Sequence, residues 1–228
     1  MALGHGDVLT GSDFSLNRET RGGVLSFWSR GAQSSFAGRE GTLGLDGDVR
    51  TTMFGVDYAR GRLVTGLSLS RSAGLGNYAG VDAGQVASAV TGLYPWLGYR
   101  ASDRVTVWGV AGYGAGGMLL TPEGGPALES GLSMAMAAAG TRGELVGGGA
   151  SGFELAFKAD AMWVDTAVDG VDGPGGRLKA TEAAVTRFRT GLEGSRDYTL
   201  ASRLSLRPSV EVGLRQDGGE PRRARAWT

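Results

Sequence analysis

The sequence predicts an all-β fold in which antiparallel strands follow one another up and down, and three observations indicate it. Apolar residues recur at every second position in segments about ten residues long. Glycine accounts for 42 of the 228 residues, with no collagen-like period. The stretches between the alternating segments are rich in the turn-forming residues Gly, Asp and Pro. Together these features indicate about nine strands.

The strands expected first carry small residues on one face. They are Val24–Gln33, Thr52–Tyr58, Leu63–Ser70, Gln85–Tyr99 and Val105–Ala115. In Thr52–Tyr58 the apolar residues Phe54, Val56 and Tyr58 alternate with Met53, Gly55 and Asp57. In Leu63–Ser70, Leu67 and Leu69 alternate with Gly66 and Ser68. For Val105–Ala115 the faces cannot be assigned, because Trp108 and Tyr113 fall on opposite parities.

Ser130–Thr141 is a further expected strand. The three strands expected after it place ionised groups on a single face, and they are Phe153–Val164, Thr186–Glu193 and Arg203–Arg215. The last of these is the clearest: Leu, Pro and Val occupy every even position from Leu204 to Leu214, while Arg, Ser, Glu and Gly occupy the odd ones. Segments of about ten residues match the length that a tilted strand needs to cross a bilayer.

The expected connections alternate in length. Ala59–Arg62 and Arg100–Arg104 are short, and Ser195–Ser202 is moderately longer. The connections Ser34–Gly47, Arg71–Gly84, Gly116–Glu129 and Asp165–Leu178 are long. Short turns on one rim and long loops on the other are typical of a membrane barrel. A soluble β-sandwich or barrel also shows this alternation, with its apolar face packed into a core, so the residue pattern alone leaves both folds open.

The composition excludes several classes of partner and anchor. Lys and Arg together equal Asp and Glu at 23 each, so no general basic field favours a nucleic acid partner. There is no Cys, which rules out disulfides and suits passage through an oxidising compartment. No stretch reaches the roughly 20 apolar residues of a membrane helix. Residues 1–20 lack a signal-peptide pattern, so export would require a longer precursor.

The sequence offers little material for catalysis. Gly112–Gly117 fits the dinucleotide-binding pattern G-x-G-x-x-G, but the following residues cannot open the helix that such a site needs. His5 is the only histidine, so triads and zinc sites lack ligands. Glu154 and Asp160 are six residues apart on one strand, about 20 Å, which is too far for a glycosidase pair. We therefore expect no enzyme activity, no cofactor and no metal.

Several short sequence motifs, which occur in a characteristic order along the chain, resemble those of a known family. Phe27-Trp28-Ser29-Arg30-Gly31 is followed by Leu45-Asp46-Gly47-Asp48-Val49, Gly55-Val56-Asp57-Tyr58 and Leu67-Ser68-Leu69-Ser70. Two further phrases are Thr91-Gly92-Leu93-Tyr94-Pro95-Trp96-Leu97-Gly98-Tyr99 and Val107-Trp108-Gly109-Val110-Ala111-Gly112-Tyr113-Gly114. From about Asp7 to Gly219 the chain resembles the C-terminal translocator domain of autotransporters, the type V secretion proteins.

The resemblance implies a fold and a division of the chain. The family fold is an antiparallel up-and-down transmembrane β-barrel of twelve strands, of which about nine would be present here. Residues 1–21 would be a passenger-to-barrel linker, with Asp7–Leu16 threading the lumen, and residues 22–216 a partial barrel. Residues 217–228 depart from the family and read as an aberrant tail after a truncation. An incomplete barrel would leave open sheet edges, which lipid does not tolerate.

The resemblance also implies a function and two sets of site residues. The domain would insert in the bacterial outer membrane as part of an exported precursor, and would help to export and display an N-terminal passenger at the cell surface. Its partners would be outer-membrane lipid, its own passenger, periplasmic chaperones and the outer-membrane assembly machinery, with no nucleic acid. The charged residues expected to face the lumen are Asp57, Glu154, Lys158, Asp160, Arg187, Arg189, Glu193, Arg207, Glu211 and Arg215. The residues expected to face lipid are Phe54, Val56, Tyr58, Leu67, Leu69, Phe153, Leu155, Phe157, Trp163, Phe188, Leu192, Leu204, Leu206, Val210, Val212 and Leu214.

Rival interpretations remain. The lumen charges would form a hydrated wall along which a passenger slides, or they would simply solvate a polar interior through cross-strand ion pairs. The chain as a whole would alternatively be a soluble β-rich ligand-binding or adhesion module that uses the loops Arg71–Gly84 and Asp165–Leu178. A third possibility is a truncated product without function.

Overall fold

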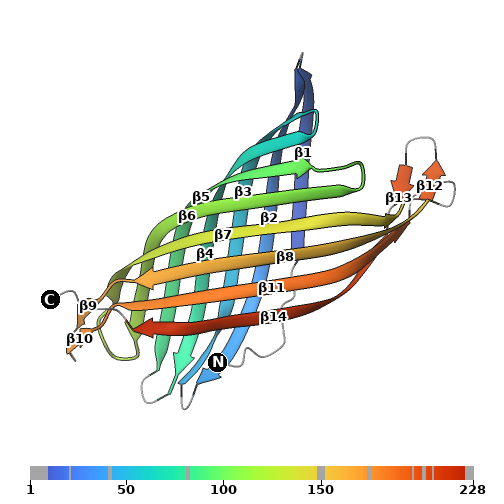
Figure 1. Cartoon of the computed structure of the whole chain (residues 1–228). Coiled ribbons are helices and arrows are strands. Elements are labelled where there is room, and N and C mark those ends of the chain that lie inside the picture. Colours follow the sequence, from blue (N-terminus) through green and yellow to red (C-terminus); the bar gives the residue numbers. More distant parts are fainter. Residues whose placement is uncertain are drawn as a thin grey trace.

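A computed structural model describes residues 10–20, 22–40, 43–80, 83–147, 152–173, 176–196, 198–201, 204–206 and 208–223. Ten long strands form one antiparallel sheet in the order β1-β2-β3-β4-β5-β6-β7-β8-β11-β14 (Figure 1). Their bounds are β1 Thr10–Thr20, β2 Gly23–Glu40, β3 Leu43–Arg60, β4 Leu63–Ala79, β5 Gly84–Arg100, β6 Val105–Pro122, β7 Leu128–Val146, β8 Phe153–Val168, β11 Thr181–Arg196 and β14 Ser209–Arg223. Each long strand between β1 and β14 pairs with the long strand before it and the long strand after it, which confirms the predicted up-and-down order.

Four short strands form two separate pairs beside the main sheet. β9 (Val171–Gly173) pairs with β10 (Gly176–Leu178) in the connection between β8 and β11. β12 (Tyr198–Ala201) pairs with β13 (Leu204–Leu206) between β11 and β14. Among the described residues no helix is long and apolar enough to cross a bilayer.

The long loops expected from the sequence are largely strand. β2 continues to Glu40 and β3 begins at Leu43, so most of Ser34–Gly47 is paired sheet. The same holds for Arg71–Gly84, where β4 continues to Ala79, and for Gly116–Glu129, where β6 continues to Pro122. Pairing with neighbouring strands overrides the weak local preference of Gly, Asp and Ser for turns. The predicted contrast between short turns and long loops is therefore wrong for these three connections.

Both ends of the predicted barrel segment also differ from expectation. Thr10–Thr20, expected within a linker, forms β1 and pairs with β2 from Thr10↔Gln33 to Thr20↔Gly23. The expected last strand, Arg203–Arg215, is divided between β13 and β14 on either side of Pro208, which has no N–H to donate to a ladder. β14 then runs on to Arg223, paired with β11, so the expectation of no strand after Gly219 is wrong for residues 220–223. The linker role of residues 1–21 stays a prediction.

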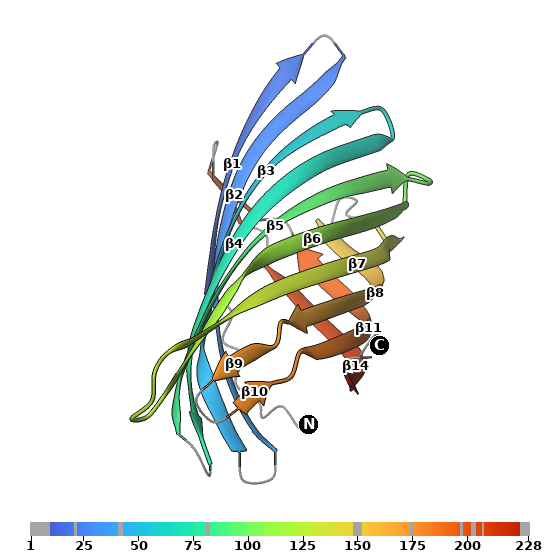
Figure 2. The same ribbon diagram turned by 90° about the vertical axis from the view of Figure 1, so that its left-hand side faces the viewer.

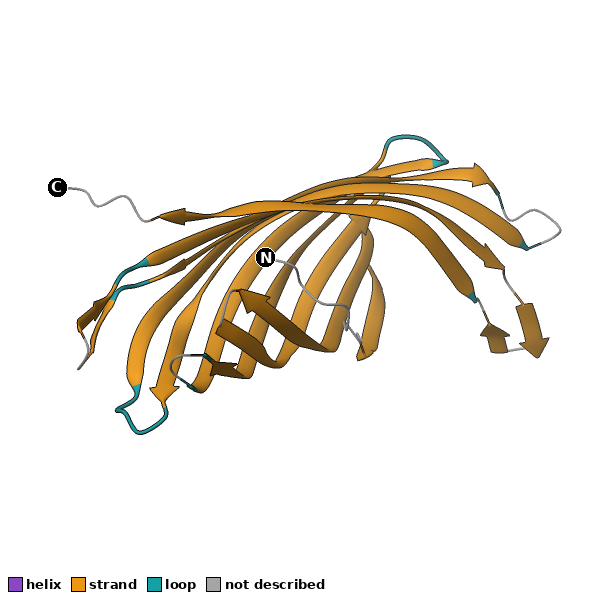
Figure 3. Ribbon diagram, turned by 90° about the horizontal axis from the view of Figure 1, so that it is seen from below, coloured by secondary structure: helices purple, strands orange, loops and turns teal. Residues whose placement is uncertain are grey.

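The sheet curls into a trough with two unlike faces (Figures 2 and 3). On β4 the residues Leu63, Leu67, Leu69 and Leu75 are exposed, while the alternating Ser68 and Ser70 are buried. On the neighbouring β5, Tyr94 is only 6% exposed, although no second layer of described residues covers it. Side chains crowd together on a concave face and separate on a convex one, so Tyr94, Ser68 and Ser70 lie on the concave side. The exposed leucines lie on the convex side.

Aromatic rings on the concave face lie over glycines of the next strand. A Cβ added to Gly55 would come within 2.2 Å of the Trp28 ring, and one added to Gly66 within 2.2 Å of Trp96 Nε1. The same relation links Gly140 to the Trp108 ring. Glycine lets the backbone approach the ring closely, which stabilises strands that would otherwise be weakened by glycine. The high glycine content therefore has a packing role in the sheet.

The register also assigns the faces of β6, which the sequence left open. Trp108 lies opposite Gly98 of β5 and Gly140 of β7, both on the concave side. Tyr113 lies opposite Leu93, and both side chains are exposed on the convex side. The fold is thus part of an antiparallel up-and-down barrel, and β1 and β14 each pair with a described strand on one side only.

Candidate functional site

The sheet register places the predicted charged residues on one face. Directly opposed residues in antiparallel strands share a face. Asp57 lies opposite Gly66, and Gly66 lies opposite Trp96. Following this row across the sheet leads through Met162 to Arg187 and then to Asp217. Nine predicted residues therefore share the concave face: Asp57, Glu154, Lys158, Asp160, Arg187, Arg189, Glu193, Glu211 and Arg215. Arg207 lies outside the described residues.

Five charged side chains form an ion-pair network across four strands, toward the end of the sheet where β7 is followed by β8. Arg142 on β7 donates to Glu154 on β8 and, at 3.3 Å, to Glu193 on β11. Lys158 on β8 donates to Glu193 and, at 3.0 Å, to Glu211 on β14. Glu193 accepts from both cations and its side chain is only 18% exposed. The network therefore ties β7, β8, β11 and β14 together through charge-assisted hydrogen bonds.

A second group of ion pairs lies farther along the same face. Arg189 Nε donates to Asp160 Oδ2 at 2.9 Å. Arg187 Nε donates to Asp217 Oδ1 at 2.8 Å, and Arg215 Nε donates to Asp217 Oδ2 at 2.8 Å. Every charged position that the sequence predicted on β8, β11 and β14 and that the structure describes thus belongs to one of these two groups. Asp57 is separate from them, since it accepts from Trp96 Nε1 at 3.0 Å.

Two members of these groups were not among the predicted site residues. Arg142 follows the expected strand Ser130–Thr141 by one residue, and Asp217 follows Arg203–Arg215 by two. Extending the two-residue alternation of Arg203–Arg215 would have placed Asp217 on the charged face. Arg142 shares its parity with Leu132, Met134 and Met136, so the pattern of its own strand does not predict its place among the charges.

The ion-pair network borders an open cavity of about 430 Å³. Its lining is entirely polar: Arg142, Glu144, Glu154, Glu193, Ser195 and Ser209. Carboxylates and a guanidinium line the same space, so the cavity can hold water and hydrogen-bond an extended peptide. Within the described residues, no group of three or more His, Asp or Glu side chains is placed to hold a metal ion.

The residues expected to face lipid lie on the convex face. Those with described side chains are Phe54, Val56, Tyr58, Leu67, Leu69, Phe153, Leu155, Phe157, Trp163, Phe188, Leu192, Val210, Val212 and Leu214. The side chains of Leu204 and Leu206 lie outside the described part of the chain. All of the fourteen except Val56, Tyr58 and Leu155 are exposed, from 37% at Phe157 to 77% at Leu214. Such a continuous apolar surface marks contact with lipid or with another protein.

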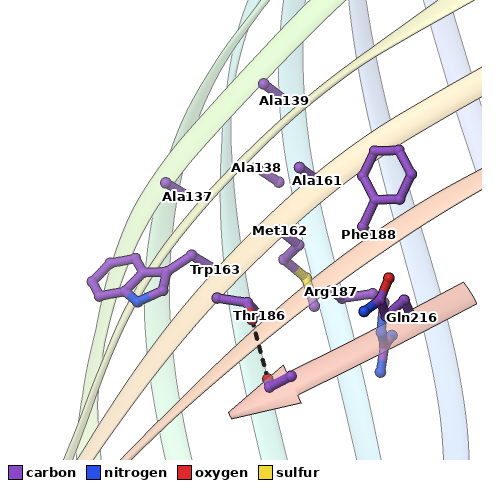
Figure 4. A pocket seen from close by; sticks show the side chains of 11 residues that line it. Ala137, Ala138, Ala139, Ala161, Met162, Trp163, Thr186, Arg187, Phe188 and Gln216 are labelled. Carbon is purple, nitrogen blue, oxygen red and sulfur yellow. Dashed lines mark hydrogen bonds between the residues drawn. The ribbon is translucent and has the colours of Figure 1, made fainter.

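Small residues open a shallow depression on this convex face (Figure 4). Ala137, Ala139 and Ala161 form its floor on β7 and β8, and Trp163 and Phe188 border it. Thr186 Oγ1 donates to the carbonyl oxygen of Gly218 at 3.2 Å, so the hydroxyl at its margin is satisfied within the sheet. The depression is therefore mostly apolar, with Gln216 as an exposed polar side chain at its margin, and it is continuous with the surface around it.

The Glu193→Gln substitution is expected to lower the free energy of unfolding by about 1–2 kcal/mol. A neutral amide would lose the charge-assisted hydrogen bonds that join Arg142 and Lys158 through Glu193, and would leave each cation with one carboxylate, Glu154 for Arg142 and Glu211 for Lys158. Urea unfolding of the protein in detergent micelles measures the change. Glu123→Gln is the control, because Glu123 is exposed in the connection between β6 and β7. Equal effects of the two substitutions would contradict a stabilising network.

Comparison with known proteins gives structural likenesses but no sequence relative. No family model matches the chain, and no curated protein matches it. Among solved structures, the ferric yersiniabactin uptake receptor FyuA from Yersinia pestis is similar with a TM-score of 0.41 and 10% sequence identity. The match covers 92% of this chain and 41% of the receptor, so the chain spans less than half the length of that protein.

Proposed function

We propose that this chain forms a wall of a β-barrel in the bacterial outer membrane and serves as the translocator and anchor of an autotransporter. The observation that carries the proposal is the separation of the two faces. Exposed aliphatic and aromatic side chains dominate the convex face, which also carries Arg50 and Arg71, and ion-paired side chains lie on the concave face. A membrane barrel needs this distribution, with lipid outside and water inside.

In a soluble β-sandwich the apolar face of the sheet would be buried and the charged face exposed, which is the reverse of the pattern in this sheet. Its Leu, Val and Phe side chains would pack into a core, and its charged face would meet bulk water. Among the described residues only Tyr94 and Ala156 are buried hydrophobic residues, and both lie on the charged side of the sheet. Within the part of the chain that the structure describes, no layer covers the apolar side, which favours lipid as its solvent.

The proposed translocator role rests on the order of the short sequence motifs in the first strands of the sheet. Asp46-Gly47-Asp48 and Gly55-Val56-Asp57-Tyr58 lie on β3, where Asp57 accepts the hydrogen bond from Trp96. These phrases are similar to those of autotransporter barrels. In such a domain the polar concave face would allow a passenger segment to pass, and would then hold the linker by hydrogen bonds. The process requires no bound cofactor.

The test is surface display of a passenger. Because β1 and β14 are open edges of the described sheet, the chain is expressed with further strands that close the barrel between them, and it is preceded by an export signal and an epitope-tagged passenger. Tag accessibility to protease is then measured on intact cells. We expect the tag to be cleaved on intact cells and the barrel to fractionate with the outer membrane. A tag that stays protected until cells are lysed would reject the translocator role. Recovery of the chain as a periplasmic soluble protein would reject the membrane location as well.

A further inference from the structure

A row of basic residues crosses the concave face of the sheet. Arg100 on β5 lies opposite Thr106 on β6, and Thr106 lies opposite Arg142 on β7. Arg142 in turn lies opposite Lys158 on β8. Because directly opposed residues share a face, Arg100 lies on the same side of the sheet as the ion-pair network.

Arg62 extends this row by one strand. Leu63 lies opposite Tyr99, and both side chains are exposed on the convex face. Successive residues of a strand point to opposite faces, so the next residue on each strand, Arg62 and Arg100, belongs to the concave face. The Arg100 N–H donates to the Arg62 carbonyl oxygen at 2.8 Å, which places the two arginines next to each other. We call Arg62 and Arg100 the arginine pair.

The arginine pair lacks the counter-ions that the rest of the row has. Arg142 and Lys158 each contact two carboxylates. Neither Arg62 nor Arg100 makes an ion pair with any residue that the structure describes, and both side chains are exposed. Like charges directly opposite each other in antiparallel strands are destabilising. The arrangement therefore favours an anion supplied from outside the sheet.

The strands around the arginine pair offer no free carboxylate on the concave face. Among the described residues of β3, β4 and β5, the only carboxylate on that face is Asp57. Asp57 accepts a hydrogen bond from Trp96 Nε1 at 3.0 Å. Asp103 lies in the turn that follows Arg100, and it forms no ion pair with either arginine.

The face on which the pair lies indicates the class of anion. Lipid surrounds the convex face of the proposed barrel, so lipid phosphates lie on the other side of the sheet. In the proposed translocator a polypeptide passes along the concave face and reaches the pair. The anions that a polypeptide carries are the carboxylates of Asp and Glu, which guanidinium groups bind through two parallel hydrogen bonds. Opposed Cβ atoms are about 4.5–5.5 Å apart, so both guanidinium groups can reach one acidic segment.

We propose that the arginine pair binds acidic side chains of the polypeptide segment that occupies the concave side of the barrel. This inference rests on the proposed function, since it requires a polypeptide in that position, and it adds the chemistry of the contact. A segment with Asp or Glu at the level of the turn between β3 and β4 would be held by the pair. A segment with neutral side chains there would be held less firmly.

Peptide binding to the full chain in a nonionic detergent tests the proposal. One probe is a short fluorescent peptide rich in glutamate, and the other is the same peptide with glutamine at every glutamate position. Fluorescence anisotropy at low salt measures the two dissociation constants. We expect the glutamate peptide to bind about fivefold more tightly, because two exposed ion pairs form and each contributes a little over twofold. High salt should remove most of this difference, because exposed charges are screened.

Two double variants decide whether the arginine pair is responsible. Arg62→Gln with Arg100→Gln removes both ion pairs, so the two peptides should then bind with about equal affinity. Arg50→Gln with Arg71→Gln is the control, because it removes the same charge from exposed positions on the convex face. The control should keep the preference of about fivefold. A cooperative urea transition in each protein shows that the variants fold.

Each contrary outcome has a distinct meaning. Equal binding of the two peptides to the unchanged chain would overturn the role of the arginine pair, and a normal surface-display result would leave the translocator role intact. An equal loss of preference in both double variants would also overturn it, because net charge would then explain the preference. Failure of surface display with an intact peptide preference would reject the translocator role and leave the arginine pair as a site for acidic peptides.

Discussion

Leu67→Arg is expected to lower the free energy of unfolding in a bilayer by about 2–4 kcal/mol, the usual effect of a cation at the lipid-facing midplane of a membrane barrel. Leu67 is 42% exposed on the convex face of β4, and Val56 and Pro95 lie opposite it on the neighbouring strands. A guanidinium there would have to stay in hydrocarbon or distort the bilayer. Urea unfolding of the protein in phosphatidylcholine vesicles measures the change.

Asn77→Arg is the matched control for this substitution. Asn77 lies on the same strand and the same face, and it is exposed ten residues nearer the other end, beyond the leucines. The same cation there should change stability by less than about 0.5 kcal/mol. In a soluble protein both exposed positions would accept arginine equally well. Equal small effects at the two positions would therefore contradict the membrane assignment of the convex face.

Tyr94→Ala is expected to lower the free energy of unfolding by about 3 kcal/mol, at the lower end of the range for deletion of a buried aromatic ring. The Tyr94 ring is buried on the concave face against two glycines, since added Cβ atoms at Gly92 and Gly112 would lie 2.2 and 2.0 Å from the Tyr94 side chain. Neither glycine has a side chain that could fill the space left by the ring. Urea unfolding in detergent micelles measures the loss.

Two substitutions separate the contribution of the ring from other effects. Tyr94→Phe keeps the ring and removes the hydroxyl, and should lose less than half as much stability as Tyr94→Ala. Tyr113→Ala removes a ring that is 59% exposed on the convex face of the neighbouring strand β6, and should have a small effect. A loss at Tyr113 as large as that at Tyr94 would contradict the assignment of the two faces.

The sequence predicted the later strands best. On β8 and β11, ionised groups alternate with aromatic and aliphatic residues over the whole expected segment, as with Lys158 and Asp160 against Phe157 and Trp163. The register then placed these charges on one face. Alternation of this kind reports directly on the strand period, so it remains reliable without knowledge of the partner strand.

The glycine-rich segments could not be predicted from local pattern. Gly47 and Gly76 read as loop residues, yet each belongs to a strand and lies close to the ring of Phe36 on β2. Such a glycine can form a turn, or it can lie in a strand beneath an aromatic ring of a neighbouring strand. Which of the two occurs depends on which strand lies beside it. That information comes from the register across residues far apart in the sequence, and the local composition does not contain it.

The partners of the charged residues were unpredictable for the same reason. The sequence places Glu193 and Lys158 on one face, but only the pairing of β8 with β11 brings them into contact with each other and with Arg142. Strand ends were the other weak point. Gly218 and Gly219 suggest the end of a strand, whereas they lie opposite Thr186 and Val185 within paired sheet.

The strands of the main sheet are longer than a bilayer crossing requires. β4 and β5 have 17 residues each, which at about 3.3 Å per residue and a tilt near 45° rise roughly 40 Å, against an apolar band of about 25 Å. In the proposed barrel, with the apolar band in lipid and the longer ends of these strands outside the cell, the remaining height would project above the bilayer as hydrogen-bonded ribbon. Antibodies raised against intact cells would then recognise folded epitopes there, and added proteases would cut only at the narrow tips.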